Sequence, residues 1–239
     1  MPNPLLPTPA ATVADVIQRM QDIDAVLPDG DGLKWFNYLY LAVTQTVQDQ
    51  LAAGALFFGD RAWIDRLDVV FANLYFATLT QGGQGGPNAA PRAWRPLLAN
   101  RMTPKIARIQ FALAGMNAHI NRDLVLALLA IYTVDGQAPG NDSVHYQDFT
   151  KVNQLLSQVE GQVRETLLVG TPLASGGDFA PLEDILAMWS VDAARQAAWD
   201  HSQAFWNLRG LPPIQSASLD ALDGLTELAS NGLIVRVLP

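Results

Sequence analysis

Apolar residues recur along this chain with the spacing of one helix face, in segments separated by short runs rich in glycine and proline. The alternation of apolar and polar positions that marks a half-buried strand is missing, except for a short tail at 234–238 that we expect to be extended. The segments between the breaks predict helices at Thr12–Leu27, Leu33–Ala53, Asp60–Leu79, Thr103–Tyr132, Asp148–Leu168, Pro181–Leu208 and Leu219–Ser230.

These segments predict an all-α fold, a single-domain helical bundle of about seven to nine helices. Pro181–Leu208 is long enough for one bent helix or two, which leaves the number open. Thr103–Tyr132 is largely apolar, so we expect it to be a long central helix. The proline-rich residues 1–11 predict an extended arm, and residues 12–239 form the helical domain. The glycine-rich segment Gln81–Pro91 is either a surface linker or a mobile lid over a pocket.

Composition limits the classes of protein to which the chain can belong. Hydrophobic residues make up 49% of the 239 residues and charged residues 16%, which is enough apolar material for a sizeable core. The longest apolar run, Leu124–Val134, is shorter than the roughly 18 residues that a membrane span needs. The first ten residues contain neither Lys or Arg nor a long apolar block, so we expect a cytoplasmic location. Zero cysteines exclude disulfides, thiolate zinc sites and cysteine nucleophiles.

Charge narrows the choice of partners. The formal net charge is −8, and no cluster of basic residues is longer than a pair. Binding to nucleic acid or to an anionic membrane surface depends on basic patches, so neither is an expected partner. We expect a small-molecule substrate instead, and the sequence leaves the oligomeric state open.

The segment Phe111–Leu128 carries the polar pair that is most informative about function. His119 and Asp123 are four residues apart, so on a helix they share a face, in largely apolar surroundings. The small residues Ala112 and Gly115 either permit close helix packing or leave space for a cavity. In the first case the pair is structural. In the second case His119 is the catalytic acid–base group and Asp123 orients it.

Two other predicted helices carry candidates for binding a substrate. Asp68 lies among apolar residues inside Asp60–Leu79, and Tyr75 lies two turns further along the same face. Arg195 and Trp199 belong to a stripe with helical spacing, and a buried arginine on such a stripe needs an acidic partner. We expect that partner to be an acidic side chain, Asp68 or Asp123, or a substrate carboxylate or phosphate held bidentately. The predicted substrate-binding residues are therefore Asp68, Tyr75, Met116, Arg195 and Trp199.

At these residues the chain resembles an uncharacterised, mainly bacterial family, domain of unknown function 5995. The resemblance extends from about Val13 to Trp206 and depends most on RLDVVFANLYF at Arg66–Phe76, FALAGMNAHINRDL at Phe111–Leu124 and AARQAAWDHSQAFW at Ala193–Trp206. It implies no established activity. It does imply that the recognisable motifs of the family include Asp68, Asn117, His119, Asp123 and Arg195.

A weaker resemblance is to the zinc-dependent helical phospholipase C and P1-type nucleases. Those enzymes use an HxxxD step, which His119 and Asp123 match. The chain departs from that pattern at Ala127, where those enzymes place another histidine, and their N-terminal tryptophan ligand is missing. These departures put a trinuclear zinc site in doubt.

Three functions from different classes follow. The first is a small-molecule enzyme with its pocket inside the bundle and acid–base chemistry by His119 and Asp123, acting as a lyase, cyclase, isomerase or hydrolase. The second is a metal-dependent hydrolase that uses His119, Asp123 and Asp68. The third is a non-catalytic binding or scaffold protein in which the polar cluster only locks the helices. With three histidines, and only His119 in the expected core, we predict no metal and no cofactor.

Overall fold

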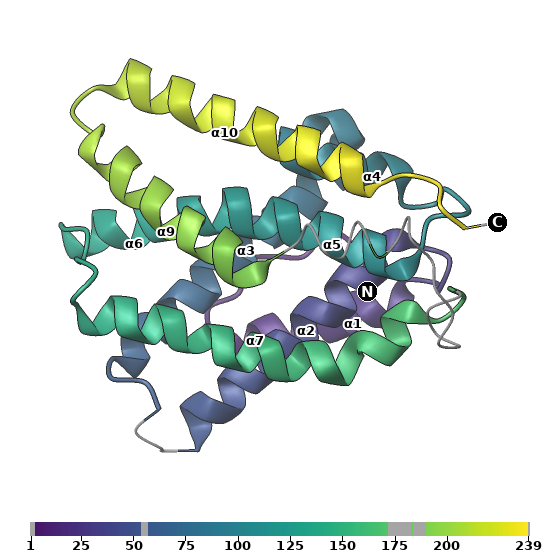
Figure 1. Cartoon of the computed structure of the whole chain (residues 1–239), viewed down its shortest axis with the longest axis horizontal. Coiled ribbons are helices and arrows are strands. Elements are labelled where there is room, and N and C mark those ends of the chain that lie inside the picture. The colour runs from purple at the N-terminus through teal and green to yellow at the C-terminus, as the bar shows by residue number, and fades with distance from the viewer. Residues whose placement is uncertain (1–2, 54–56, 172–182, 184–189, 239) are drawn as a thin grey trace.

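The most apolar part of the chain forms a continuous rod through the middle of the molecule. The rod consists of α5 (Arg108–Ala118), the π-helical turn η3 (His119–Leu124) and α6 (Val125–Asp135). Every residue from Ile109 to Ile120 is buried, as expected for a helix that is surrounded on all sides. The other helices pack around this rod in the computed structural model (Figure 1). The predicted long central helix is confirmed.

The structure describes residues 3–53, 57–171, 183 and 190–238. These ranges contain nine α-helices and no β-strand, which confirms the all-α, single-domain bundle. The helices around the rod are α1 (Val13–Val26), α2 (Gly32–Ala52), α3 (Arg61–Gly85), α4 (Arg95–Asn100), α7 (Val144–Leu168), α9 (Val191–Asn207) and α10 (Pro212–Leu233), with short 3₁₀ turns η1 (Pro87–Ala89) and η2 (Arg92–Trp94). None of the helices in these ranges is long and apolar enough to cross a bilayer.

The central rod begins at Arg108 and not at the Thr103–Pro104 cap signal, so this predicted boundary is wrong. Lys105 has a left-handed backbone, with φ of 66°, and a residue in that conformation interrupts a helix. The start of the helix is satisfied instead by Gln110, whose Oε1 accepts a hydrogen bond from the Ala107 N–H at 2.8 Å.

Asp148 caps a different helix from the one predicted. α7 begins at Val144 with Ser143 as its N-cap, so Asp148 lies inside the helix, where it is fully buried. Its carboxylate accepts from the backbone N–H groups of Gly59 at 2.8 Å and Asp60 at 2.6 Å, immediately before α3. The aspartate therefore fixes the start of a neighbouring helix.

Two further helices are longer than the sequence predicts. α3 continues past Leu79 to Gly85, so half of the glycine-rich segment Gln81–Pro91 is helical and part of the remainder is the turn η1. α10 extends well beyond Leu219–Ser230 in both directions. The first part of the predicted helix Pro181–Leu208, residues 181–190, lies mostly outside the described residues. The rest of this predicted helix corresponds to α9.

The proline-rich arm is tied to the surface of α1 and α3. Ala10 exchanges two backbone hydrogen bonds with the side chain of Asn73 on α3, at 2.7 and 3.0 Å. Arg19 of α1 donates to the carbonyl oxygens of Thr8 at 2.7 Å and Pro9 at 2.9 Å. These contacts give the arm a defined place although it lacks regular secondary structure beyond a turn.

The small residues of the rod serve close helix packing. A Cβ atom added at Gly115 would lie 2.3 Å from Cγ of Phe36 on α2, and one added at Gly32 of α2 would lie 2.3 Å from the ring of Phe111. Ala112 is fully buried next to this contact. Of the two interpretations of Ala112 and Gly115, the structure supports close packing of α2 against α5.

We predict that Gly115→Ala destabilises the protein by about 1–2 kcal/mol, because the overpacking cost exceeds the gain in helix propensity. Gly161→Ala is the matched control, since Gly161 lies in α7 with no neighbouring atom within 4 Å of an added Cβ. That variant should gain about 0.5–1 kcal/mol. Urea melts measure both, and equal changes in the two variants would refute the packing argument.

Candidate functional site

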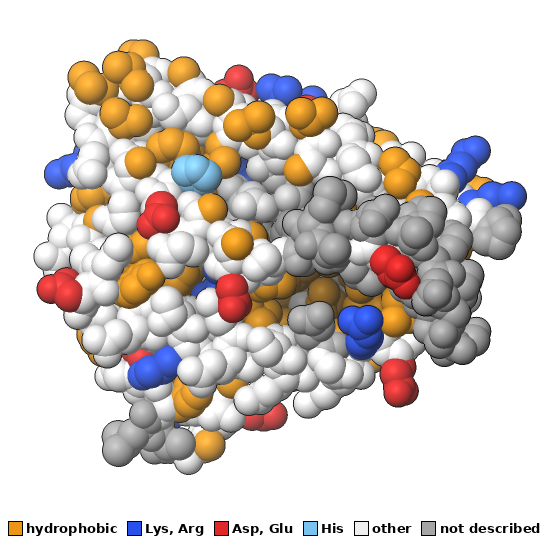
Figure 2. Space-filling model, in the orientation of Figure 1, with side chains coloured by type: hydrophobic (Ala, Val, Ile, Leu, Met, Phe, Trp, Pro, Cys, Tyr) orange, Lys and Arg blue, Asp and Glu red, His pale blue; other side chains and the backbone are white. Residues whose placement is uncertain are grey.

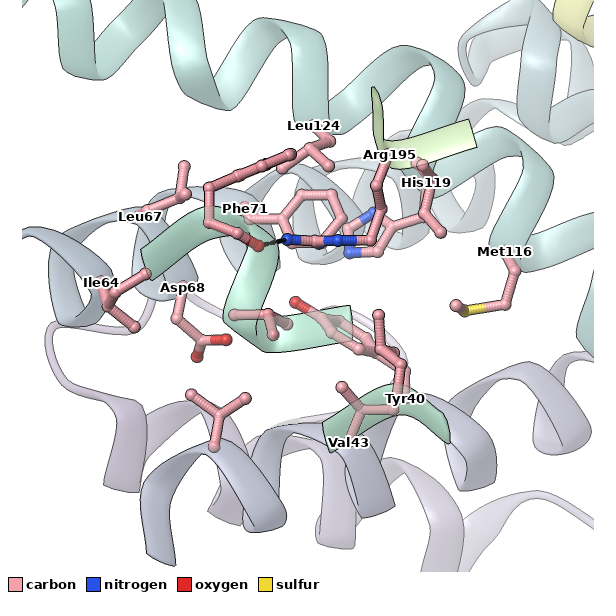
Figure 3. Close-up of a pocket in the computed structure, with 15 residues that line it drawn as sticks. Tyr40, Val43, Ile64, Leu67, Asp68, Phe71, Met116, His119, Leu124 and Arg195 are labelled. Atoms are coloured by element: carbon pink, nitrogen blue, oxygen red, sulfur yellow. Dashed lines mark hydrogen bonds between the residues drawn. The ribbon is translucent and has the colours of Figure 1, made fainter. Parts of the chain in front are cut away.

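A cavity of about 60 Å³ lies beside the middle of the central rod, bounded also by α2, α3, α7 and α9. Most of its wall is apolar. Four polar side chains from four different helical segments point toward one another across it (Figure 3): Tyr40 of α2, Asp68 of α3, His119 of η3 and Arg195 of α9. The volume is enough for a few water molecules or for the compact end of a larger molecule.

The imidazole ring of His119 is held in one orientation. Its Nδ1 lies 3.0 Å from Oδ2 of Asp123, the contact that their four-residue spacing predicts. The ring stacks on Phe71 with centroids 3.6 Å apart and planes 7° from parallel, and the Tyr40 ring meets it edge-on at 4.6 Å. Because Nδ1 is bonded to Asp123, Nε2 is the nitrogen left for the cavity.

Both members of this pair belong to the π-helical turn, His119–Leu124. A π turn closes with a hydrogen bond from residue i to i+5, so it is wider than an α-helical turn. Such turns are rare, and they occur frequently at functional sites. A regular helix of 3.6 residues per turn predicts the contact between His119 and Asp123 from their spacing, but it gives no indication that the turn is widened here.

The carboxylate of Asp123 is completely occupied by donors. Oδ2 accepts from Trp94 Nε1 at 2.9 Å as well as contacting His119, and Oδ1 pairs with Arg122 at 2.5 Å. Arg122 in turn pairs with Asp223 of α10 at 3.1 Å. Asp123 is fully buried and does not line the cavity. It therefore orients the His119 ring without facing the cavity itself.

These contacts define the protonation state of His119. A carboxylate surrounded by donors accepts hydrogen bonds only, so His119 Nδ1 carries the proton and Nε2 keeps its lone pair. Burial lowers the pKa of His119 despite the opposing hydrogen bond and charge of Asp123. Near neutral pH the ring is therefore an uncharged base facing the cavity.

Three of the polar atoms at the cavity have no hydrogen-bond partner among the described residues. They are the hydroxyl of Tyr40, Oδ2 of Asp68 and Nε2 of His119, and each is shielded from solvent. The Thr44 hydroxyl lies close enough to Tyr40 to lower the pKa of the phenol slightly against the effect of burial, although the two hydroxyls form no hydrogen bond of regular geometry. A buried polar atom without a partner costs about 1–3 kcal/mol. Here three such atoms, from three different helical segments, surround one cavity, which makes this cavity the candidate site for a polar ligand.

The titration of Asp68 is shifted toward neutrality. Burial, with a smaller contribution from the charge of Asp65, raises the pKa of Asp68 to about 7. The pKa of Tyr40 is raised well above its ordinary value, first by burial and then by the charges of Asp68 and Asp123. At pH 7 the cavity thus combines a carboxyl group that is partly protonated, a neutral phenol and a neutral imidazole.

Arg195 is buried as predicted, but the prediction that it pairs with Asp68 or Asp123 is wrong. Its Nε donates to Asn153 Oδ1 and its Nη2 to the carbonyl oxygen of Phe149, both at 2.7 Å, and its guanidinium lies 4.2 Å from the Phe149 ring centroid. Asp123 already has donors on both of its oxygens, and Arg195 is held by α7 through Asn153 and Phe149, so that Oδ2 of Asp68 stays unpaired. Burial lowers the pKa of Arg195 to about 10.

Two of the predicted substrate-binding residues lie elsewhere in the core. The Tyr75 hydroxyl donates to Asn37 Oδ1 at 3.2 Å, and its ring stacks on Trp94. Trp199 donates from Nε1 to Asn141 Oδ1 at 2.8 Å and packs against Phe149. Both side chains are fully buried and neither lines the cavity. The three other predicted residues, Asp68, Met116 and Arg195, do line it.

Sequence reasoning missed Tyr40 and Phe71. Tyr40 stands in the string WFNYLYL, where aromatic residues on an apolar helix read as ordinary core. The available signal was its hydroxyl, because a tyrosine expected to be buried needs a hydrogen-bond partner. Phe71 lies one turn after Asp68 on α3, and its role as a stacking surface for His119 has no signature in the sequence.

The described part of the chain contains no group of three or more His, Cys, Asp or Glu side chains placed to hold a metal ion. Of the unpaired groups at the cavity among the described residues, the His119 nitrogen and the Asp68 carboxylate are the common metal ligands, and the third is the neutral phenol of Tyr40. Asp123, the third ligand of the metal-dependent alternative, has both oxygens occupied.

Comparison with known proteins gave a single positive result. No curated protein and no solved structure matches the chain. The resemblance to zinc-dependent helical phospholipase C and P1-type nucleases therefore has no support. The model of a family of unknown function, DUF5995, matches residues 13–236 and so includes every residue of the cavity wall. The chain belongs to this DUF5995 family.

Proposed function

We propose that the protein is an enzyme that moves protons on a small molecule bound in this cavity, with His119 as the base and Asp68 as the acid. The observation that carries the proposal is the convergence of three unpaired, shielded polar atoms, on Tyr40, Asp68 and His119, at one cavity. The pKa of His119 is lowered, and the pKa of Asp68 is raised to about 7. Such opposite shifts in neighbouring groups identify one as the base and the other as the acid.

In the proposed reaction, His119 Nε2 removes a proton from the substrate and becomes an imidazolium. Asp123 stabilises that cation through Nδ1, as the carboxylate does in a Ser-His-Asp triad. The protonated carboxyl group of Asp68 delivers a proton to a second atom of the substrate, so that the charge developing there is neutralised. Tyr40 donates a hydrogen bond, and Arg195 holds an anionic group.

This chemistry suits an isomerase or lyase better than an acyl transferase. None of the described residues that line the cavity is a serine, threonine or cysteine, so the usual nucleophiles of acyl transfer are missing from that wall. Hydrolysis would need His119 to activate a water molecule. In keeping with the net charge of −8, the proposal gives the protein a small-molecule partner, without nucleic acid or membrane, in the cytoplasm.

We predict that His119→Gln lowers the turnover rate by about 100-fold or more, the usual contribution of a general base. The assay incubates the protein with a cellular metabolite extract in D₂O, and mass spectrometry detects compounds that change or gain deuterium. His201→Gln on α9 is the control, because His201 does not line the cavity. If no compound changes with the wild-type protein, or if His119→Gln keeps the rate, the proposal is wrong.

The tautomer of His119 gives a second prediction that needs no substrate. In the wild-type protein, two-bond ¹⁵N–¹H correlation spectra should show Nδ1 protonated and Nε2 free. Asp123→Asn replaces an obligate acceptor by an amide that can also donate, so the Nε2–H tautomer should become populated. Protonated Nε2 in the wild-type protein would leave no base facing the cavity.

We predict that the stability difference between Asp68→Asn and the wild type depends on pH. The folded state holds the Asp68 proton up to pH about 7 and the unfolded state only up to about 4, so wild-type stability falls as pH rises between these values. The shift of about three units corresponds to at most ~4 kcal/mol. Asparagine cannot ionise, so the stability of the variant relative to the wild type should increase from pH 4 to pH 8.

Urea melts at pH 4.5, 6 and 8 measure this difference. Asp49→Asn, at an exposed position on α2, is the control and should show no comparable trend. The titration of His119 is present in all these proteins and largely cancels in the comparison. A difference between Asp68→Asn and the wild type that stays constant with pH would show that Asp68 titrates like an exposed carboxylate.

A further inference from the structure

A second pocket adjoins the cavity and is much larger. Its volume is about 350 Å³, and it shares Val43, Met116 and Leu156 with the wall of the cavity. It lies between α2, α5, the second half of α7 and the start of α9. Figure 2 shows it as a hollow on the viewed face, with hydrophobic side chains on its floor. We call it the outer pocket.

The outer pocket has the character of a site for an apolar molecule. Its known walls are mainly aliphatic, and the few polar residues are Ser157, Arg164, Ser190 and Asp192. Small-molecule sites are typically apolar clefts of about 300–1,000 Å³ with few polar groups. A cavity of ~150 Å³ holds one benzene molecule, so 350 Å³ has room for roughly ten to twelve carbon atoms.

The cavity at the inner end contains a buried cation, Arg195, that forms no ion pair with any described residue, although the charge of Asp192 on the same helix raises its pKa against the effect of burial. Arg195 is 6% exposed, and its recorded partners are an amide oxygen and a backbone carbonyl. No carboxylate in the described ranges forms an ion pair with it, and its Nη1 has no hydrogen bond there. Buried arginines are almost always paired, because an uncompensated buried charge is costly. An anionic group of a ligand in the cavity would supply the missing partner.

Met116 connects the two spaces. It lines both the cavity and the outer pocket, and it lies at the end of α5, about one turn before His119 (Figure 3). A methionine side chain is unbranched and has three rotatable bonds, so it adapts to different shapes. Because the two spaces share Met116 as well as Val43 and Leu156, a ligand that occupied both would pass this side chain on its way to Arg195.

We propose that the protein binds an amphiphilic carboxylate, with an apolar body of roughly ten carbon atoms in the outer pocket and its carboxylate on Arg195 in the cavity. In this arrangement, the carbon atoms adjacent to the ligand's carboxylate lie beside His119 and Asp68. The inference names a substrate class for the proposed function. It rests on the proposed function only where it assigns the reacting atoms to this part of the ligand. The binding itself needs Arg195 and the outer pocket alone.

The test compares decanoate with 1-decanol, which has the same body without the charge, by isothermal titration calorimetry. We expect decanoate to bind the wild-type protein at least ~10-fold more tightly than decanol. Arg195→Gln should remove that preference, and Arg195→Lys should keep part of it because the charge remains. Equal affinity of the wild-type protein for both ligands, or no binding of either, overturns the inference, whether or not Arg195→Gln folds.

The outer pocket is tested separately with Ser157→Trp. Ser157 is exposed at the pocket wall, so the variant should fold, and the indole should weaken decanoate and decanol alike by about 10-fold or more. Ser157→Ala is the matched control and should bind both as the wild type does. Unchanged binding to Ser157→Trp would place the apolar body elsewhere and overturn the inference.

His119→Gln separates the two proposals. It should keep the preference for decanoate over decanol, because Arg195 and the outer pocket are intact, while turnover is lost. If decanoate binds but His119→Gln keeps full turnover, the proposed function fails and the binding inference stands. If turnover depends on His119 but the substrate found carries no carboxylate, the binding inference fails alone.

Discussion

The arrangement of the site depends on one buried carboxylate. Asp123 has no access to solvent, and a charge in that position is tolerated only when donors surround it. The donors come from η2, through Trp94, and from the π turn itself, through His119 and Arg122. Arg122 extends the network to Asp223 of α10. A single negative charge thus fixes the imidazole and ties the central rod to two of its neighbours.

Other polar groups on the rod show what a purely structural role looks like. Gln110 accepts from the N–H of Ala107 and donates to two carbonyl oxygens near the end of α10. Asn117 donates to the carbonyl of Thr226 and to Ser230 of the same helix, and it accepts from Asn121. Every donor and acceptor in these groups has a partner, whereas His119 keeps one nitrogen unpaired. Asn117 and His119 are two residues apart, yet the fully paired side chain of Asn117 serves packing, whereas the unpaired nitrogen of His119 belongs to the candidate site.

The sequence predicts the bundle and the pair of His119 and Asp123 because helical periodicity decides which residues share a face of one helix. It predicts less well across helices. Arg195 and Trp199 share a stripe, yet one reaches the cavity and the other bonds to Asn141, since a difference of one turn selects another neighbour. Asp148 reads as a cap but serves the preceding α3. Such choices depend on which helices meet, and local pattern carries no information about that.

The π turn has a consequence for how this chain tolerates length changes. Compared with a regular α-helix, it accommodates additional backbone within one turn of an otherwise continuous rod. Deleting one residue among Ile120–Arg122 would let the rod regularise to a continuous α-helix, and α5 and α6 would keep their relative orientation because the deletion removes the additional residue. Asp123 would then follow His119 by three residues instead of four, so its contact with Nδ1 would have to form anew, while the faces of α6 that meet α3 and α9 would stay in place. Within the central rod, therefore, a single-residue deletion is best accommodated in this turn, whereas the same deletion inside α5 or α6 would rotate the helix that follows by about 100°.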